Sequence, residues 1–131
     1  HTDITRIITG PGTGTTPGTS SGTGVLDLHK TVWNVTRDID GNVALPGETL
    51  RYTITYTNVG DGHLNELVIH DSVPAFTQLV PASLDCDDHP LELSPCSATD
   101  TIDGSLEWRW TGTDRLAPGS SGSVSYEVVI D

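Results

Sequence analysis

Acids and amides that could bind a cation gather in one short segment, residues 38–48, "DIDGNVALPGE". Asp38, Asp40 and Asn42 carry side-chain oxygen atoms at alternate positions beside a glycine. Such oxygen ligands suit Ca²⁺, although the glycine and the closing acid of the full calcium loop are not in place. A turn rich in Asp and Gly also forms without an ion. The segment therefore predicts either a Ca²⁺ site or a plain turn, and no other cofactor is required.

Lys30 is the single lysine of the chain, and its alternation with the preceding leucines turns it inward on an extended strand. A buried ammonium group is costly unless it is paired. One resolution is a salt bridge, or a side chain that reaches the end of the domain. The other is a covalent amide (isopeptide) bond to a carboxyl or carboxamide group, for which Asn58, Asp71 and Asp131 are the candidates.

Two further motifs concern covalent chemistry. Cys86 and Cys96 flank "DDHPLELSP", which has the composition of a loop, and we expect a local disulfide that pins this loop. The chain-entropy estimate for such a bridge is about 3 kcal/mol. Free or metal-bound thiols are the alternative, but no second Cys or His pair has zinc-finger spacing. Asn34 begins "NVT", the one N-glycosylation sequon. No Ser-His-Asp, Cys-His, paired-carboxylate or phosphate-loop motif stands out, so the chain is predicted not to be an enzyme.

Charge and hydropathy exclude several classes of partner. Eighteen acids against six bases give a formal net charge of −12, which repels nucleic acid and anionic membrane surfaces. No stretch has the apolar length of a membrane span, so membrane insertion is not expected. The chain starts at His1 rather than Met, which suggests either a removed leader or a piece excised from a longer chain. With the expected disulfide, this predicts an extracellular or cell-surface location.

Residues 25–131 read as strands separated by turns rich in Gly and Pro. The segment "ETLRYTITYTN" alternates strictly, with Leu50, Tyr52, Ile54 and Tyr56 on one face. Similar alternation runs through 26–32, 106–110 and 124–130. Residues 64–73 lack Gly and Pro and could form a helix, but their Val and Ile content favours a strand. The pattern predicts an all-β antiparallel sandwich of immunoglobulin-like size, with Trp108 and Trp110 in the core.

The N-terminal residues form two further units. Residues 1–9 contain a β-branched stretch in which Ile4, Arg6, Ile7 and Ile8 are typical of a strand. Residues 10–24 consist only of Gly, Thr, Pro and Ser and predict a flexible linker. A strand needs a neighbour for its backbone groups. It could add to another molecule by donor-strand complementation, fold back on its own domain, or remain a disordered tail. The fifteen-residue linker favours addition to another molecule.

A family resemblance rests on "PGETLRYTITYTNVGD", on the "DSVP" that closes a strand, and on "LAPGSSGSVSYEV" near the end. In the order and spacing of these motifs, residues 25–131 resemble the conserved-repeat domain of unknown function found in bacterial and archaeal surface proteins. The resemblance implies an immunoglobulin-like sandwich with a structural or adhesive role and no catalysis. The family is usually found as tandem copies, whereas this chain holds one copy, and its Cys86–Cys96 segment looks like an insertion.

Together these features predict a subunit of an extracellular, pilus-like filament. Copies of the chain would join head to tail through their N-terminal strands into a homopolymer. The alternative is a monomeric cell-surface module, adhesive or binding surface glycans, on a Thr-rich stalk.

Overall fold

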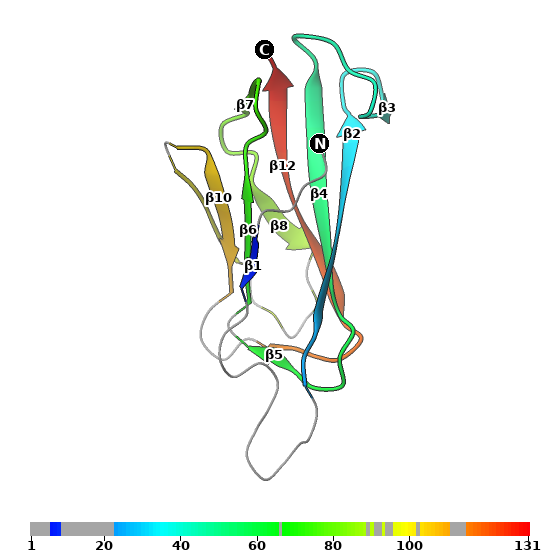
Figure 1. Ribbon diagram of the computed structural model, residues 1–131, viewed down its shortest axis with the longest axis vertical. Coiled ribbons are helices and arrows are strands. Elements are labelled where there is room, and N and C mark those ends of the chain that lie inside the picture. Colours follow the sequence, from blue (N-terminus) through cyan, green and yellow to red (C-terminus); the bar gives the residue numbers. More distant parts are fainter. Residues whose placement is uncertain are drawn as a thin grey trace.

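Two antiparallel β-sheets pack face to face in the part of the chain that the structure describes (Figure 1). This structure is a computed structural model that describes residues 6–8, 23–65, 67–88, 90, 93, 96–101, 103–110 and 115–131. For residues 6–8, 65 and 87 it describes the backbone only. No helix occurs within these ranges, and accordingly none that could cross a membrane. The predicted all-β antiparallel sandwich is confirmed.

Three long strands form the middle of the larger sheet, in the spatial order β2 (Leu26–Asn34), β4 (Thr49–Asn58) and β12 (Ser121–Ile130). Short strands extend both of its edges. β3 (Ile39–Asp40) pairs with the end of β2, while β7 (Thr77–Leu79) and β8 (Asp85–Asp88) pair with different parts of β12. Over most of its length, therefore, β2 is the edge strand of the larger sheet.

The smaller sheet has the order β1 (Arg6–Ile8), β6 (Val68–Ser72), β10 (Ser105–Arg109) and β9 (Ser97–Asp100). A separate two-stranded ladder joins β5 (Leu64–Asn65) to β11 (Arg115–Leu116). Residues 64–65 and 68–72 are thus extended, as the Val and Ile content of this segment predicted. β10 lies between β6 and β9, which leaves β1 as the outermost strand on one side.

The core fills the space between the sheets with the side chains that alternation assigned to it. In β4, Tyr52, Ile54 and Tyr56 are buried, while the intervening Arg51 and Thr55 are exposed. The rings of Tyr52 and Tyr126 stack at a centroid distance of 5.3 Å. Aromatic side chains bury a large apolar area each, so such contacts contribute much of the favourable free energy of folding.

Two Pro-Gly turns bring long strands of the larger sheet into register. Glu48 donates its backbone N–H to Leu45 O, and Ser120 donates to Ala117 O. The glycines at the third position, Gly47 and Gly119, have φ values of 86° and 81°. A type II turn requires positive φ at this position, which glycine adopts without steric cost.

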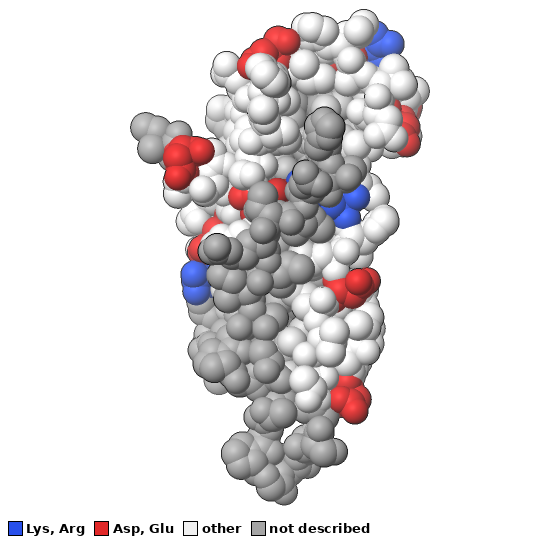
Figure 2. All heavy atoms as spheres, in the orientation of Figure 1, with Lys and Arg blue, Asp and Glu red and all other residues white. Residues whose placement is uncertain are grey.

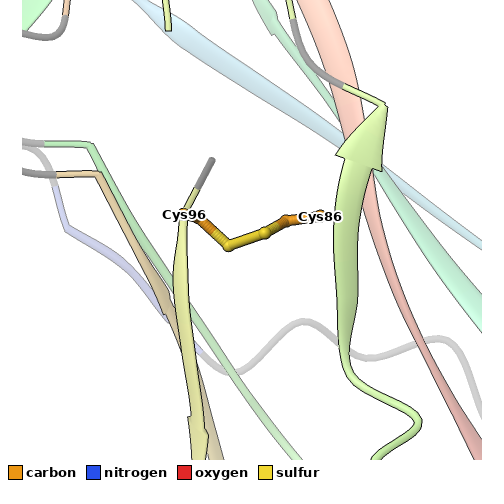
Figure 3. Close-up of a disulfide and its surroundings, with 2 residues drawn as sticks. All are labelled: Cys86 and Cys96. Atoms are coloured by element: carbon orange, nitrogen blue, oxygen red, sulfur yellow. A yellow bond between two sulfur atoms is a disulfide. The ribbon is translucent and has the colours of Figure 1, made fainter. Parts of the chain in front are cut away.

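The disulfide between Cys86 and Cys96 is confirmed, but it does more than close a loop (Figure 3). Cys86 lies within β8 of the larger sheet, and Cys96 directly precedes β9 of the smaller sheet. The expectation that the residues between the cysteines form a loop is wrong for Asp87 and Asp88, because β8 continues through them and pairs with β12. The bridge ties the two sheets together at the side opposite β1.

We expect the Cys86→Ala/Cys96→Ala double variant to lose about 3 kcal/mol of unfolding free energy, because the unfolded chain regains the entropy of the opened loop. Guanidinium denaturation followed by tryptophan fluorescence measures the loss. Wild-type protein kept in reductant is the matched control and should unfold at the same midpoint as the variant. Equal midpoints for the variant and the oxidised wild type would contradict this prediction.

Candidate functional site

The outer edge of the smaller sheet is the first candidate site, because the N-terminal strand lies there. β1 runs antiparallel to β6, with Ile7 opposite Ile69 and Ile8 opposite Val68 (Figure 1). Of the predicted polymerisation residues, Arg6, Ile7 and Ile8 are placed by their backbones, and Ile4 lies outside the described residues. The pairing is within one chain, as in the fold-back arrangement that the sequence left open.

The start of β6 is buried on both of its faces. Val68 and Ile69 are neighbours in the strand and point to opposite faces, yet they expose only 4% and 0% of their surface. An antiparallel sheet with one solvated face normally alternates between apolar and polar residues, so both faces of β6 are covered at these two positions. Within the sheet, β6 pairs with β10 on one side and with β1 on the other.

A buried ion pair lies beside this edge and joins the two sheets. Lys30 Nζ of β2 is 2.5 Å from Oδ2 of Asp71 in β6, and the two side chains expose 2% and 1% of their surface. The hydroxyl of Tyr126 donates to the same Oδ2 at 3.0 Å. The Lys30 ammonium also lies 5.0 Å from the ring centroid of Tyr52. Desolvation, and then the charge of Asp71, raise the pKa of the Tyr126 phenol far above its ordinary value, so this group remains a donor.

Among the partners predicted for Lys30, the structure brings Asp71 to it and assigns the others different places. Asn58 is buried and donates its amide to Gly62 O and Leu116 O at 2.7 and 2.9 Å. Asp131 is exposed after the last strand. Alternation places Asp71 on the inward face of β6 with Ile69, but it also places Asn58 on the inward face of β4, so it could not choose between them.

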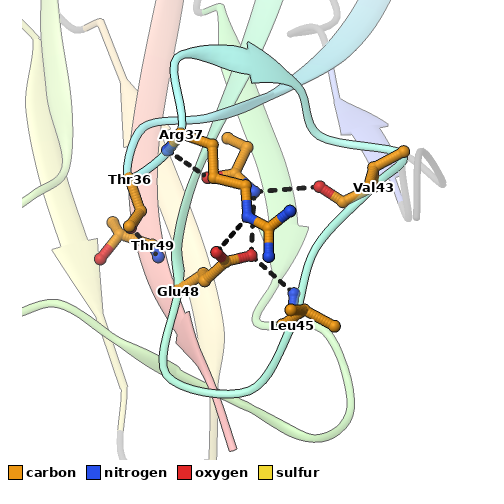
Figure 4. Close-up of polar contacts among 7 residues, drawn as sticks. Thr36, Arg37, Val43, Leu45, Glu48 and Thr49 are labelled. Carbon is orange, nitrogen blue, oxygen red and sulfur yellow. Dashed lines mark hydrogen bonds and ion pairs between the residues drawn. The ribbon is translucent and has the colours of Figure 1, made fainter.

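Residues 34–49 form a closed hydrogen-bonded loop at the upper end of the molecule (Figure 4). Asn34 is fully buried and donates its amide to Val43 O at 2.9 Å and to Glu48 Oε1 at 3.2 Å. Glu48 also pairs with Arg37 and accepts from the backbone N–H of Leu45 at 2.7 Å. The Arg37 hydrogen bond is the main cause that lowers the pKa of Glu48 below its ordinary value of 4.5.

The predicted calcium ligands lie on this loop, but side-chain oxygens of Asp38 and Asp40 accept hydrogen bonds from other groups of the protein. Asp38 accepts a hydrogen bond from the indole of Trp33 at 3.2 Å, and Asp40 accepts from the backbone N–H of Asn42 at 2.8 Å. Within the described residues, no three acidic, histidine or cysteine side chains form a group that could hold a metal ion. The contacts are those of a turn, and Ca²⁺ binding by this loop stays a prediction.

The sequon and the tryptophans have clear positions as well. The Asn34 amide is committed to two acceptors inside the loop, so attachment of a glycan there would require the loop to open. Trp108 and Trp110 are buried, as alternation predicted, and offer no ring face to a sugar.

Acidic side chains are scattered over the face seen in Figure 2 with few basic ones between them, in keeping with the net charge of −12.

Comparisons of the chain with protein-family models, with curated proteins and with solved structures gave no match.

We expect Asn34→Ala to lower the unfolding free energy by about 2–3 kcal/mol, because Val43 O loses its donor and Arg37 N–H loses its acceptor. Asn42→Ala, on the exposed part of the same loop, is the matched control and should change it by less than about 0.5 kcal/mol. Chemical denaturation measures both. Equal losses in the two variants would show that the loop does not depend on Asn34.

Proposed function

We propose that this chain is the structural subunit of an extracellular, pilus-like filament that polymerises by strand exchange. The strand Arg6–Ile8 of one molecule would pair with β6 of the next, in the register that it has within one chain. The observation that carries the proposal is this antiparallel pairing by an N-terminal strand that precedes a fifteen-residue segment of Gly, Thr, Pro and Ser. The same contacts form whether the strand comes from the same molecule or from a neighbour.

The edge of β6 that pairs with β1 supports the proposal, because leaving this edge without a strand costs free energy. Without β1, the backbone N–H and C=O groups on one side of β6 would have no strand partner, and the apolar residues Val68 and Ile69 would lie at an open edge. Exposed edges of this kind recruit extended segments from other chains. The main-chain hydrogen bonds would supply affinity, and apolar side chains of residues 4–8 would supply specificity.

The linker permits both fold-back and exchange. A short tether gives the strand an effective concentration on the order of 1 mM at its own domain, so a neighbour competes only if the filament adds further contacts. Thr23 is hydrogen-bonded to Asp61, so residues 10–22 supply the reach, at most about 45 Å, which is enough to extend to an adjacent molecule. The linker is therefore long enough for exchange, and contacts between domains of neighbouring molecules must make exchange more favourable than fold-back.

Exposed apolar side chains at the two ends of the sandwich are suited to make those contacts between copies. The segments 39–45 and 73–76 lie at the upper end (Figure 1) and carry Ile39, Val43, Leu45 and Phe76, of which Phe76 exposes 82% of its surface. Val25 and Val59 are exposed at the lower end, where β2 begins and β4 ends. End-to-end stacking of two copies would bury both groups, and because such a contact is head to tail it extends into a filament.

The other properties of the chain fit this role. The disulfide suits an oxidising, extracellular environment, and the net charge of −12 disfavours contact with nucleic acid. The resemblance of residues 25–131 to the immunoglobulin-like conserved-repeat domain also points to a structural part in a cell-surface assembly. In this proposal the protein needs neither a cofactor nor turnover.

A monomeric cell-surface module on a Thr-rich stalk is the second candidate. The specific observation that favours it is the pairing of β1 with β6 of its own chain. In that case the N-terminal strand would be a permanent part of the domain. The burial of Trp108 and Trp110 means that adhesion or glycan binding would have to use other residues.

Deletion of residues 2–9 tests whether the strand is needed for polymerisation. We expect the full chain to form fibres in electron microscopy and the truncated chain to form none, because its β6 edge has no strand to receive. A synthetic peptide of residues 2–9 should raise the Tm of the truncated chain by filling this edge, and a peptide with Ile7→Asp should do so less. Fibres of unchanged appearance from the truncated chain would contradict the proposal.

A cysteine pair across the two strands distinguishes exchange from fold-back. Arg6 and His70 are directly opposite, a position from which Arg6→Cys and His70→Cys can form a disulfide. For the proposed filament we expect a ladder of covalent multimers on a non-reducing denaturing gel. A single monomer band with the new disulfide would instead support the monomeric module. Arg6→Cys alone is the control and should give no ladder beyond dimer.

A further inference from the structure

The buried contact between Lys30 and Asp71 places an amine beside a carboxyl group. Lys30 is the sole lysine of the chain, and its Nζ is 2.5 Å from Asp71 Oδ2. Both side chains are almost completely excluded from solvent. We propose that Lys30 and Asp71 condense to an intramolecular amide bond that joins the two sheets covalently. This inference does not depend on the proposed filament.

Burial favours the reaction because it penalises the charged reactants. An ammonium and a carboxylate lose their hydration when they are buried, and the attraction between them often does no more than offset this cost. Transfer of one proton within the pair gives a neutral amine and a neutral carboxylic acid, which are the reactive forms. The fold holds these groups in contact, so the condensation has the high effective concentration of an intramolecular reaction.

The step is balanced by the two side chains alone. The nitrogen lone pair of Lys30 attacks Cγ of Asp71, and the new N–C bond gives a tetrahedral intermediate. The C–Oδ2 bond then breaks, and this oxygen leaves as water with two of the three protons that the ammonium carried. The third proton stays on the amide nitrogen. Two opposite charges disappear, and no oxidant, reductant or activating reagent is consumed.

Two donors already contact the carboxyl oxygens in positions that the reaction needs. The backbone N–H of Ser72 donates to Asp71 Oδ1 at 2.8 Å and would stabilise the negative charge that this oxygen gains in the intermediate. The Tyr126 hydroxyl donates a hydrogen bond to Oδ2 at 3.0 Å, so it can stabilise this oxygen as the C–Oδ2 bond breaks. The ring of Tyr126 also lies 5.8 Å from Nζ and so helps to enclose the amine.

Intact mass measurement of the folded, full-length protein tests the bond. The expected mass is about 20 Da below that of the linear sequence, of which about 18 Da is the lost water and about 2 Da the hydrogens of the disulfide. Lys30→Arg keeps a positive charge but removes the nucleophile, and should lose only the 2 Da. Asp71→Asn retains a leaving group and should lose about 17 Da as ammonia in place of the water.

Tryptic digestion locates the bond, which matters because aspartates followed by glycine can also lose water. Trypsin should fail to cut after Lys30, and after reduction the product should be residues 7–37 joined to residues 52–109. Tyr126→Phe retains the ring and removes the hydroxyl that donates to Asp71, so the folded variant should cross-link more slowly than the wild type. Equal rates would overturn the assignment of Tyr126.

A wild-type mass that lacks only the 2 Da of the disulfide, after prolonged incubation of the folded protein, would overturn the proposal and leave a plain ion pair. A loss of 18 Da that persists in Lys30→Arg would overturn it as well, because the water would then come from another site. The wild-type measurement needs no variant, so a variant that fails to fold does not affect the test.

Discussion

The contact between Lys30 and Asp71 is the interaction on which the β1 side of the sandwich depends. It joins the edge strand of the larger sheet to β6 of the smaller one, and it does so with charged groups removed from water. Such a pair is tolerated only where its partners are fixed, and the rings of Tyr52 and Tyr126 fix them here. β6 is held by its ladder to β10, and the ion pair links it across the core to β2, close to the edge that β1 occupies.

The two sides of the sandwich are held by different means. A disulfide connects the sheets at the β8 and β9 side, whereas the Lys30–Asp71 contact connects them at the side where β1 is added. The two contacts therefore connect the sheets on both sides of the core. In the proposed filament, a subunit would have to stay folded while it releases one strand and accepts another, and both links lie outside the exchanged strand.

Much of this fold could be predicted because alternation in a strand depends on neighbours in sequence. The inward positions of β4, β10 and β12 were correct, and so were the buried Trp108 and Trp110. Short strands with mixed composition were missed, since β7, β8 and β9 become strands only through pairing with distant segments. The loop around Asn34 was missed for a similar reason. Its polar network joins Asn34 and Arg37 to Glu48, more than ten residues along the chain, and no sequence motif contains all three.

Sequence by itself determined the class of structure, the pairing of Cys86 with Cys96 and the inward direction of Lys30, because each follows from local periodicity or from the count of one residue type. Tertiary structure alone decided what these residues join. It made the disulfide a link between sheets, and it selected Asp71 from several candidates as the partner of Lys30. The physical reason is that both choices depend on which strands meet across the core. Long-range packing sets these meetings, and the local sequence pattern carries no information on it.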